Sequence, residues 1–383
     1  MDKPTVQDIF HRFYPAYLDQ YSPSPVQAKV AHNIMNCKTG AYGANVCVCE
    51  DCGFVQIHYN SCRNRCCPMC QAVPKEMWMD ARREDVLDAP YFHLVFTVPD
   101  ILNPVIYSNQ RLLYDALYHA ASSTISELTA DPKHLGAKVG YICILHTWGS
   151  EMNFHPHIHT ILLGGGLASN NQWKDNGENF FLPIRVISKM FRGKYLEELK
   201  RLWEEDKLVF HDTAEKFRNH YTFKELLDSC YGMDWIPHCK KTFNGAQTVI
   251  KYLGKYTHRI AVSNHRIVRM DDDTVTFLVK DYRNEGQWKE LTISGVEFVR
   301  RFLMHVPPRR FVRIRHYGLL CSRTKSQKLT LCRNLLGCKK YLSKLRDMEM
   351  PEILEHLYGI KVCVCKACGG HLGKPQMRMP LRC

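Results

Sequence analysis

The chain has 383 residues and a formal net charge of +14, so it is long enough for two or three domains with a sizeable core. Its first residues lack a signal-peptide pattern, and no uncharged apolar run approaches the roughly 18 residues that a membrane span needs. We therefore expect a soluble, cytoplasmic protein that does not enter a membrane and whose 18 cysteines bind metal rather than form disulfides.

The first thirty-odd residues predict amphipathic helices, because Ile9, Phe10, Phe13 and Tyr14 recur at helical spacing. Cysteines then crowd together from Cys37 onward, with Gly and Asn between them and no long periodic element. This composition indicates a small module that a metal ion organises.

Two Cys-x-x-Cys motifs, Cys49–Cys52 and Cys67–Cys70, lie fifteen residues apart in that module. Four thiolates at this spacing predict a closed tetrahedral zinc site, and a redox-active cysteine pair is the weaker alternative. The other cysteines of the module either complete a second zinc site or are buried free thiols: Cys37, Cys47, Cys62 and Cys66.

The middle of the chain alternates between strand and helix patterns. The apolar run Tyr91–Pro99 predicts a buried strand that ends at proline. We also expect strands over 139–148 and 155–163, paired antiparallel, helices over 108–128, 188–227 and 248–257, and a strand pair over 274–278 and 288–293.

The sequence His155-Pro-His157-Ile-His159 begins the third of these strands. Side chains alternate between the two faces of a strand, so His157 and His159 point the same way and Ile158 points into the core. Two neutral imidazoles on one face are suitable ligands for a divalent ion. The alternative is a half-buried strand whose polar face happens to carry histidines.

Tyr252 and Tyr256 are four residues apart and share one face of the predicted helix. Aromatic residues at this spacing are usually core, but Lys251, Lys255 and Arg259 flank the pair, and phosphates suit such a density of cations better than a dry core does. A tyrosine can attack a phosphodiester to form a covalent phosphotyrosine, while an ion held by the histidines polarises the phosphate. Two tyrosines would allow strand transfer.

The excess positive charge is confined to one segment. Between Phe298 and Arg346 there are fourteen Lys and Arg and no acidic residue, which equals the net charge of the whole chain. Aromatic side chains interleave with the bases, which suits phosphate contacts and base stacking. The segment therefore predicts a nucleic-acid partner, contacted by Arg309, Arg310, Arg313 and Arg315.

Near the end of the chain, a further cysteine cluster surrounds Gly369-Gly370-His371. Its spacing is irregular, and it suggests a further small zinc knuckle formed by Cys363, Cys365, Cys368 and Cys383.

Several longer runs give the chain a specific resemblance, from about residue 30 to residue 330. They are Cys62-Arg-Asn-Arg65, Cys67-Pro-Met-Cys-Gln71, Val95–Pro99, His146-Thr-Trp-Gly149, Tyr252–Arg259 and Arg315–Leu320. Together with the His-x-His strand and the tyrosine pair, they resemble the two-tyrosine HUH endonucleases that act as rolling-circle transposases, in the insertion-sequence-ninety-one group.

The resemblance implies an α+β fold with a ferredoxin- or RRM-like antiparallel sheet. It implies an N-terminal helical and zinc-binding module over 1–75, a catalytic domain over 76–300 and a basic, DNA-contacting region over 301–383. The implied activity is cleavage and rejoining of single-stranded DNA at the ends of a mobile element in a bacterial nucleoid. The implied cofactors are Mg²⁺ or Mn²⁺ at the catalytic site and structural Zn²⁺.

By position, the resemblance makes His157 and His159 metal ligands and Tyr252 and Tyr256 nucleophiles. It also calls for a third ligand, for which we expect His146 on the antiparallel neighbour strand, ahead of Gln247 and then His155. The family often has histidine where this chain has Cys66, which leaves the second zinc site open. No helicase-type phosphate loop occurs in the sequence, so host replication or helicase factors would separate the strands.

Two other functions compete with the transposase. A zinc-dependent, sequence-specific DNA-binding regulator would explain the cysteines and the basic segment but not the tyrosine helix. A metal-dependent nuclease that uses water would need a carboxylate base near the histidines, and between Leu145 and Gly166 the sequence offers only Glu151.

Overall fold

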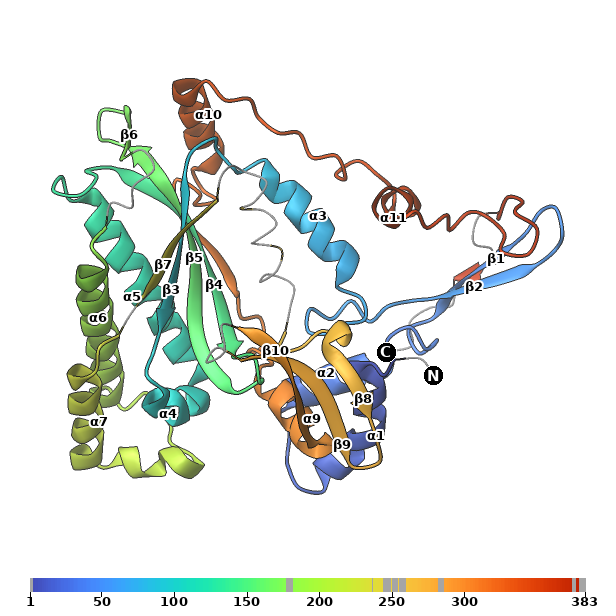
Figure 1. Cartoon of the computed structure of the whole chain (residues 1–383), viewed down its shortest axis with the longest axis horizontal. Helices are drawn as coiled ribbons and strands as arrows, with labels where there is room; N and C mark the ends of the chain where they lie inside the picture. The colour runs from blue at the N-terminus through green and yellow to red at the C-terminus, as the bar shows by residue number, and fades with distance from the viewer. Residues whose placement is uncertain are drawn as a thin grey trace.

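The computed structural model describes residues 3–176, 182–235, 237–243, 249, 254, 260–281, 286–373 and 377–378. Among these residues, a central antiparallel sheet takes the strand order β11-β4-β5-β3-β7, and a short strand, β6, pairs with β5 (Figure 1). The strand bounds are β3 Tyr91–Thr97, β4 Lys138–Trp148, β5 Phe154–Leu167, β6 Trp173–Asp175, β7 His238–Phe243 and β11 Ile314–Gly318.

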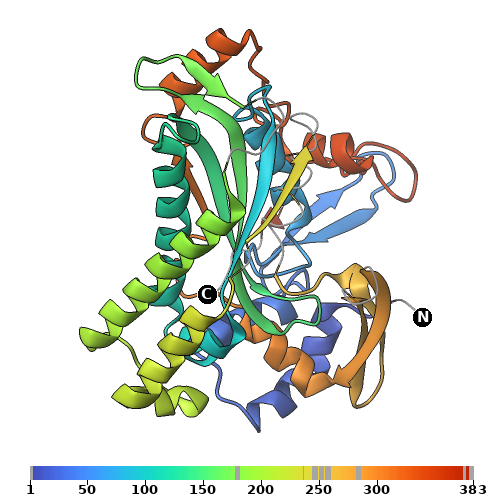
Figure 2. The same cartoon turned by 60° about the vertical axis from the view of Figure 1, so that its left-hand side comes forward.

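Helices cover one face of this sheet (Figure 2). They are α4 Asn103–Ser108, α5 Gln110–Ala130, α6 Ile184–Glu204 and α7 His220–Gly232. The strands present alternate residues to them, among them Phe92 and Phe96 of β3 and Ile158 of β5, in the largest apolar core of the described chain. Because side chains alternate along a strand, His157 and His159 must lie on the opposite face.

That opposite face has its own apolar cluster, which includes Ile144 of β4 and Ile161 and Leu163 of β5. It is covered in part by α3 (Ala72–Arg83) and α10 (Lys325–Leu336), as Figure 1 shows. Met79 of α3 and Val249 belong to the same cluster. The histidines therefore share their face of the sheet with α3 and with Val249.

A second core joins the N-terminal helices to a small antiparallel sheet in the order β10-β9-β8. Each N-terminal helix begins at a capping box, formed by Thr5 with Asp8 and by Ser24 with Gln27. The elements are α1 Val6–Leu18, α2 Pro25–Met35, β8 Ile267–Met270, β9 Thr274–Asp281, β10 Gln287–Ser294 and α9 Gly295–Met304.

A third sheet projects from this body in the order β12-β1-β2 (Figure 1). It combines β1 (Ala44–Val48) and β2 (Val55–Tyr59) with β12 (Met377–Arg378), so residues from the two ends of the chain pair here. The chain reaches β12 from α10 by way of α11 (Met350–Tyr358), passing over α3.

These observations confirm the predicted fold class, an α+β chain with antiparallel sheets. The expected strands over 91–99, 139–148 and 155–163 are present, and the last two pair antiparallel as predicted. The edge strand β11 lies within the segment 301–383 that the sequence assigns to a separate basic region. Among the described residues, no helix combines the length and apolarity that crossing a membrane requires.

Candidate metal and nucleophile site

Three histidines meet on the open face of the central sheet. His157 and His159 extend from β5, and His146 lies directly opposite His157 on β4. One ring nitrogen of each histidine lies within 4.8 Å of those of the other two, and all three side chains are buried. The antiparallel register thus brings together the two predicted ligands and the residue expected as the third.

The hydrogen bonds of the rings leave the lone pairs of His157 and His159 directed toward each other. His157 Nδ1 donates to the carbonyl oxygen of His155 at 2.7 Å, so the Nε2 of a neutral His157 carries the lone pair. That Nε2 lies 3.0 Å from Nε2 of His159. Burial lowers the pKa of His157 to about 3 and holds the pKa of His159 well below its ordinary value, so both rings are neutral at physiological pH.

His93 of β3 contacts His159 on the side of its ring that faces away from His157. The sequence analysis did not identify His93 as a site residue. Its Nε2 lies 2.9 Å from Nδ1 of His159, and the two rings stack with centroids 5.1 Å apart. The sequence analysis passed over His93 because it lies in an apolar strand. It is, however, the one histidine in a run predicted to be fully buried, and a buried polar side chain needs a hydrogen-bond partner. That requirement could have identified His93 as a residue of the site.

His155 and Gln247 are the other two candidates for the third ligand. His155 is one-third exposed, and its Nδ1 lies 3.3 Å from the carboxylate of Asp100. It is absent from the three-histidine group. Gln247 lies outside the described residues.

Both predicted nucleophiles, Tyr252 and Tyr256, also lie outside the described residues, as do their neighbours Lys251, Lys255 and Arg259. Two residues of that segment are described. Val249 is buried in the apolar cluster on the histidine face of the sheet, and Gly254 is buried against α3, where a Cβ atom would overlap Met79 and lie 3.3 Å from Cε of Lys75.

A cavity of about 860 Å³ adjoins the histidines. The three histidines and Gly254 line it, together with basic and aromatic side chains from the zinc-binding module, from α3, and from the β8–β10 sheet and the turn before it: Arg65, Lys75, Arg266, Lys280 and Trp288. Nζ of Lys280 lies 5.5 Å from the centroid of the Trp288 ring. A cavity with cations and an exposed indole suits a phosphate chain with unpaired bases.

Eight of the cysteines that the structure describes form two groups of four, and these differ from the predicted sets. The prediction that Cys49, Cys52, Cys67 and Cys70 share one site is wrong as a grouping. Cys67 and Cys70 lie with Cys37 and Cys62, whereas Cys49 and Cys52 lie with Cys365 and Cys368. The first motif lies in the turn between β1 and β2, whereas the second follows β2 and the loop after it, so the two motifs stand at different ends of this hairpin.

The remaining cysteines of the predicted sets fall outside both groups. Cys47 and Cys66 are buried free thiols, the alternative that the sequence had left open, and Cys363 is exposed. Cys383 lies outside the described residues. In the first group, Sγ of Cys62 and Sγ of Cys70 are 3.8 Å apart.

The basic segment is only partly free to meet DNA. Arg309 and Arg310 are exposed. The guanidinium of Arg315 instead pairs with Asp115 and lies 4.0 Å from the Tyr118 ring centroid, while burial lowers the pKa of Arg313. Other basic residues of the segment form ion pairs with acidic residues elsewhere in the chain. Lys325, for example, pairs with Asp85 at 2.7 Å.

Two family models match the chain. Residues 9–98 match the model described as "Transposase zinc-binding domain" (Zn_Tnp_IS91), and residues 140–328 match the model described as "Putative transposase" (Y2_Tnp). The first range contains all four cysteines of the group Cys37, Cys62, Cys67 and Cys70, and the second contains the three histidines.

Two curated relatives are similar over most of the chain. The "Putative transposase y4qJ" of Sinorhizobium fredii is 40% identical over 369 residues, which cover 95% of this chain and 93% of the relative. The "Transposase for insertion sequence element IS801" of Pseudomonas savastanoi pv. phaseolicola is 30% identical over 309 residues, which cover 79% and 72%. A solved structure, the conjugative relaxase TrwC in complex with oriT DNA, aligns at 13% identity with a TM-score of 0.25, over 43% of this chain and 71% of that one.

Proposed function

The chain belongs to the IS91 family of transposases, and we propose that it cleaves and rejoins single-stranded DNA through 5′-phosphotyrosine intermediates, by a rolling-circle mechanism. One observation carries the proposal. The cavity lined by His146, His157 and His159 is also lined by Gly254, which stands between the two tyrosines in the sequence. Gly254, two residues from each tyrosine, therefore borders the histidine site, and this supports Tyr252 and Tyr256 as its nucleophiles.

The donor set fits a divalent ion, with His146, His157 and His159 as its holders. Three neutral imidazoles are a nitrogen set, which first-row transition ions accept readily, whereas Mg²⁺ prefers oxygen ligands and water. Of the two ions expected from the family, these side chains therefore favour Mn²⁺. When bound, the ion supplies polarisation of the scissile phosphate.

The tyrosines supply the covalent chemistry. The phenolic oxygen of Tyr252 or Tyr256 attacks phosphorus, a P–O bond to the tyrosine forms, and the bond from phosphorus to the 3′ oxygen breaks. The proton lost by the phenol is matched by the one that the leaving 3′ hydroxyl gains. Lys75, Arg266 and Lys280 bring positive charge to the cavity, which favours both the phosphate and the phenolate.

The covalent link keeps the energy of the phosphodiester bond, so a 3′ hydroxyl from another strand can reverse the step and join the DNA at a new place. The second tyrosine allows a second strand to be cut before the first is released. We propose the ends of the mobile element and its target as the single-stranded partners, with host replication or helicase factors to separate the duplex.

The test is an adduct assay on the full chain. Single-stranded DNA that carries an end of the encoding element is incubated with Mn²⁺ or Mg²⁺ and then denatured. We expect a protein–DNA adduct that is lost with EDTA and in the double variant Tyr252→Phe, Tyr256→Phe.

The competing functions give other results in the same assay. A DNA-binding regulator would bind the DNA without cutting it. A nuclease that uses water would cut it without an adduct, and its cleavage would survive the loss of both tyrosines. Either result would overturn the proposal.

A further inference from the structure

Two short segments from opposite ends of the chain share the same motif and meet in space. Residues 49–53 read Cys-Glu-Asp-Cys-Gly, and residues 365–369 read Cys-Lys-Ala-Cys-Gly. Sγ of Cys49 lies 3.6 Å from Sγ of Cys368, and Sγ of Cys52 lies 3.8 Å from Sγ of Cys365. All four sulfurs lie within 4.8 Å of one another.

These separations fit a tetrahedral metal site. With zinc–sulfur bonds of about 2.3 Å, the edges of a tetrahedron of sulfurs measure roughly 3.8 Å. A disulfide would require sulfurs only about 2 Å apart. The sulfur positions therefore match zinc ligation and exclude paired disulfides in this conformation.

The two segments also have the same backbone turn. The amide of Gly53 donates to the carbonyl of Cys49 at 3.0 Å, and the amide of Gly369 donates to the carbonyl of Cys365 at 2.9 Å. Both glycines are left-handed, with φ of +71° and +77°, a conformation that residues with a Cβ rarely adopt. The amides of Ala367 and Gly370 also donate to the sulfurs of Cys365 and Cys368, at 3.4 Å in each case, which stabilises thiolates.

Backbone pairing between the chain ends supports the same unit. β12 pairs with β1, Cys49 forms a bridge with Leu372, and the amide of Gly373 donates to the carbonyl of Val48 at 3.2 Å. Within the described ranges, the apolar cluster at this site consists of Cys47, Cys49, Cys365 and Leu372. So small a core does not hold two distant segments together, and a bound metal would supply the missing free energy.

We infer that Cys49, Cys52, Cys365 and Cys368 form a zinc ribbon assembled from both ends of the chain, and that its ion fastens the C-terminal segment across α3. This site extends beyond the matched zinc-binding domain, since residues 9–98 contain two of its four ligands and the other two lie near the C-terminus.

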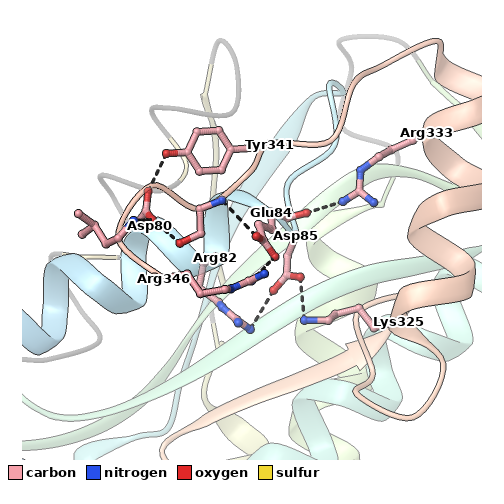
Figure 3. A network of polar contacts seen from close by, with 10 residues as sticks. Asp80, Arg82, Glu84, Asp85, Lys325, Arg333, Tyr341 and Arg346 are labelled. Atoms are coloured by element: carbon pink, nitrogen blue, oxygen red, sulfur yellow. Dashed lines mark hydrogen bonds and ion pairs between the residues drawn. The ribbon is translucent and has the colours of Figure 1, made fainter. Parts of the chain in front are cut away.

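The segment that the ribbon fastens is residues 338–349, here called the strap. It lies against α3 and the capping residue Glu84 (Figure 3). The carboxylate of Asp80 accepts from the hydroxyls of Tyr341 at 2.6 Å and Ser343 at 2.5 Å and from the amide of Leu345 at 3.0 Å. Glu84 pairs with Arg346 at 2.6 Å.

The strap acts on the helix that borders the catalytic cavity. Next to Asp80 on α3, Met79 contacts Gly254, and Lys75 lines the cavity. α11 follows the strap, and its His356 and Leu357 border a small cavity with α3. The zinc ribbon holds the C-terminal end of the connection formed by the strap and α11. Zinc binding there therefore supports the position of α3 against Gly254.

The experiment measures zinc in the full-length chain by native mass spectrometry. Because the three-histidine site can also bind zinc, every variant is compared in the His157→Ala, His159→Ala background. In that background we expect two ions per chain when all cysteines are present and one in the double variant Cys365→Ser, Cys368→Ser. The double variant Cys49→Ser, Cys52→Ser should lose the same ion, so the quadruple variant should still hold one. The control Cys363→Ser, Cys383→Ser removes cysteines of the same region and should keep both ions.

Cysteine alkylation of the unmodified wild type gives an independent test that does not depend on folding of a variant. As a chelator withdraws zinc stepwise, Cys49, Cys52, Cys365 and Cys368 should become labelled together, whereas the exposed Cys363 is labelled from the start. Trypsin cleavage at Lys339, Lys340 and Lys344 should accelerate in the same step.

The inference is overturned if the quadruple variant loses both ions, if Cys365→Ser, Cys368→Ser keeps both, or if the two motifs are labelled in separate steps. None of these measurements uses DNA cleavage, so they stand apart from the proposed strand-transfer activity.

Discussion

Nε2 of His93 lies 2.9 Å from Nδ1 of His159, on the side of that ring opposite His157. This contact sets which nitrogen of His159 is available to a cation. For His159 to offer the lone pair of Nε2, its Nδ1 must carry the hydrogen and donate it, and His93 is the acceptor.

Removal of that acceptor should weaken cation binding. We expect His93→Leu to lower the Mn²⁺ affinity of the chain about 10- to 100-fold, the usual cost of losing a partner behind a metal ligand. His93→Gln keeps an acceptor oxygen and should restore much of the affinity. Titration followed by the electron paramagnetic resonance signal of free Mn²⁺ measures both.

A second buried histidine serves as the control. Nε2 of His305 donates to the carbonyl oxygen of Met152 at 3.0 Å, and its Nδ1 lies 3.1 Å from the hydroxyl of Thr147. Since His305 does not belong to the three-histidine group, His305→Gln should leave Mn²⁺ affinity unchanged. Wild-type affinity in His93→Leu would contradict the role of His93.

His146 and His155 offer a direct comparison between two ligand alternatives. We expect His146→Ala to reduce Mn²⁺ affinity by more than the roughly 100-fold that an outer partner costs, because its ring nitrogen belongs to the three-histidine group. His155→Ala should have little effect, since that ring is partly exposed beside Asp100. Calorimetric titration decides between them, and the reverse order of effects would make His155 the ligand.

Gly254→Ala should slow adduct formation without changing Mn²⁺ affinity. The added Cβ would overlap Met79, so the nucleophile segment must move away from α3. Met79→Ala makes room, and the double variant should recover much of the rate. The measurement is the single-turnover rate of adduct formation at saturating Mn²⁺.

Gly193 of α6 is the matched control for that substitution, because a Cβ there meets nothing within 4 Å. Gly193→Ala should stabilise the helix by up to about 1 kcal/mol and leave the adduct rate as it is. Equal rates in Gly254→Ala and the wild type would disprove the close packing of this segment on α3.

Trp288 should act as a stacking surface for bases of the single strand. Its side chain is 53% exposed, lines the cavity beside the three histidines and lies near Lys280. Loss of one stacked base costs about 1–3 kcal/mol, so Trp288→Ala should weaken single-strand binding roughly 5- to 100-fold. Fluorescence anisotropy in EDTA measures binding without cleavage. Trp288→Phe should keep most of the affinity, and Tyr221→Ala, an exposed aromatic on α7, should not change it.

Asp80 should contribute stability that depends on pH. Burial acts to raise the pKa of Asp80, but hydrogen bonds from Ser343, Tyr341 and the Leu345 amide outweigh it and hold the pKa below its ordinary value of 3.8. The contribution is therefore present above that value and is lost as the pH falls through the lower pKa of the folded state.

Asp80→Ala should lower the free energy of unfolding by about 3 kcal/mol at pH 7, because buried donors of the strap lose their acceptor. The difference from the wild type should shrink below about pH 4. Urea denaturation at both pH values measures it. Asp88→Ala, at an exposed aspartate that follows the same helix, should stay within about 0.5 kcal/mol of the wild type.

Features that follow from local spacing were predictable from the amino-acid sequence. Alternation along one strand puts His157 and His159 on the same side, and Cys-x-x-Cys spacing makes each pair of thiols a half-site for metal. These geometries depend only on the backbone within a few residues. The strand and helix patterns of the central sheet were also predictable, because burial imposes their periodicity.

The groups that meet across long stretches of sequence became known from the folded chain. Sequence order suggested that Cys49 and Cys52 join Cys67 and Cys70, yet the strap carries Cys365 and Cys368 to them instead. Likewise, His93 becomes a partner of His159 through strand register, and Asp80, Glu84 and Asp85 meet the basic segment through packing. Contacts of this kind depend on how whole elements close long loops and fill the core, which no local spacing encodes.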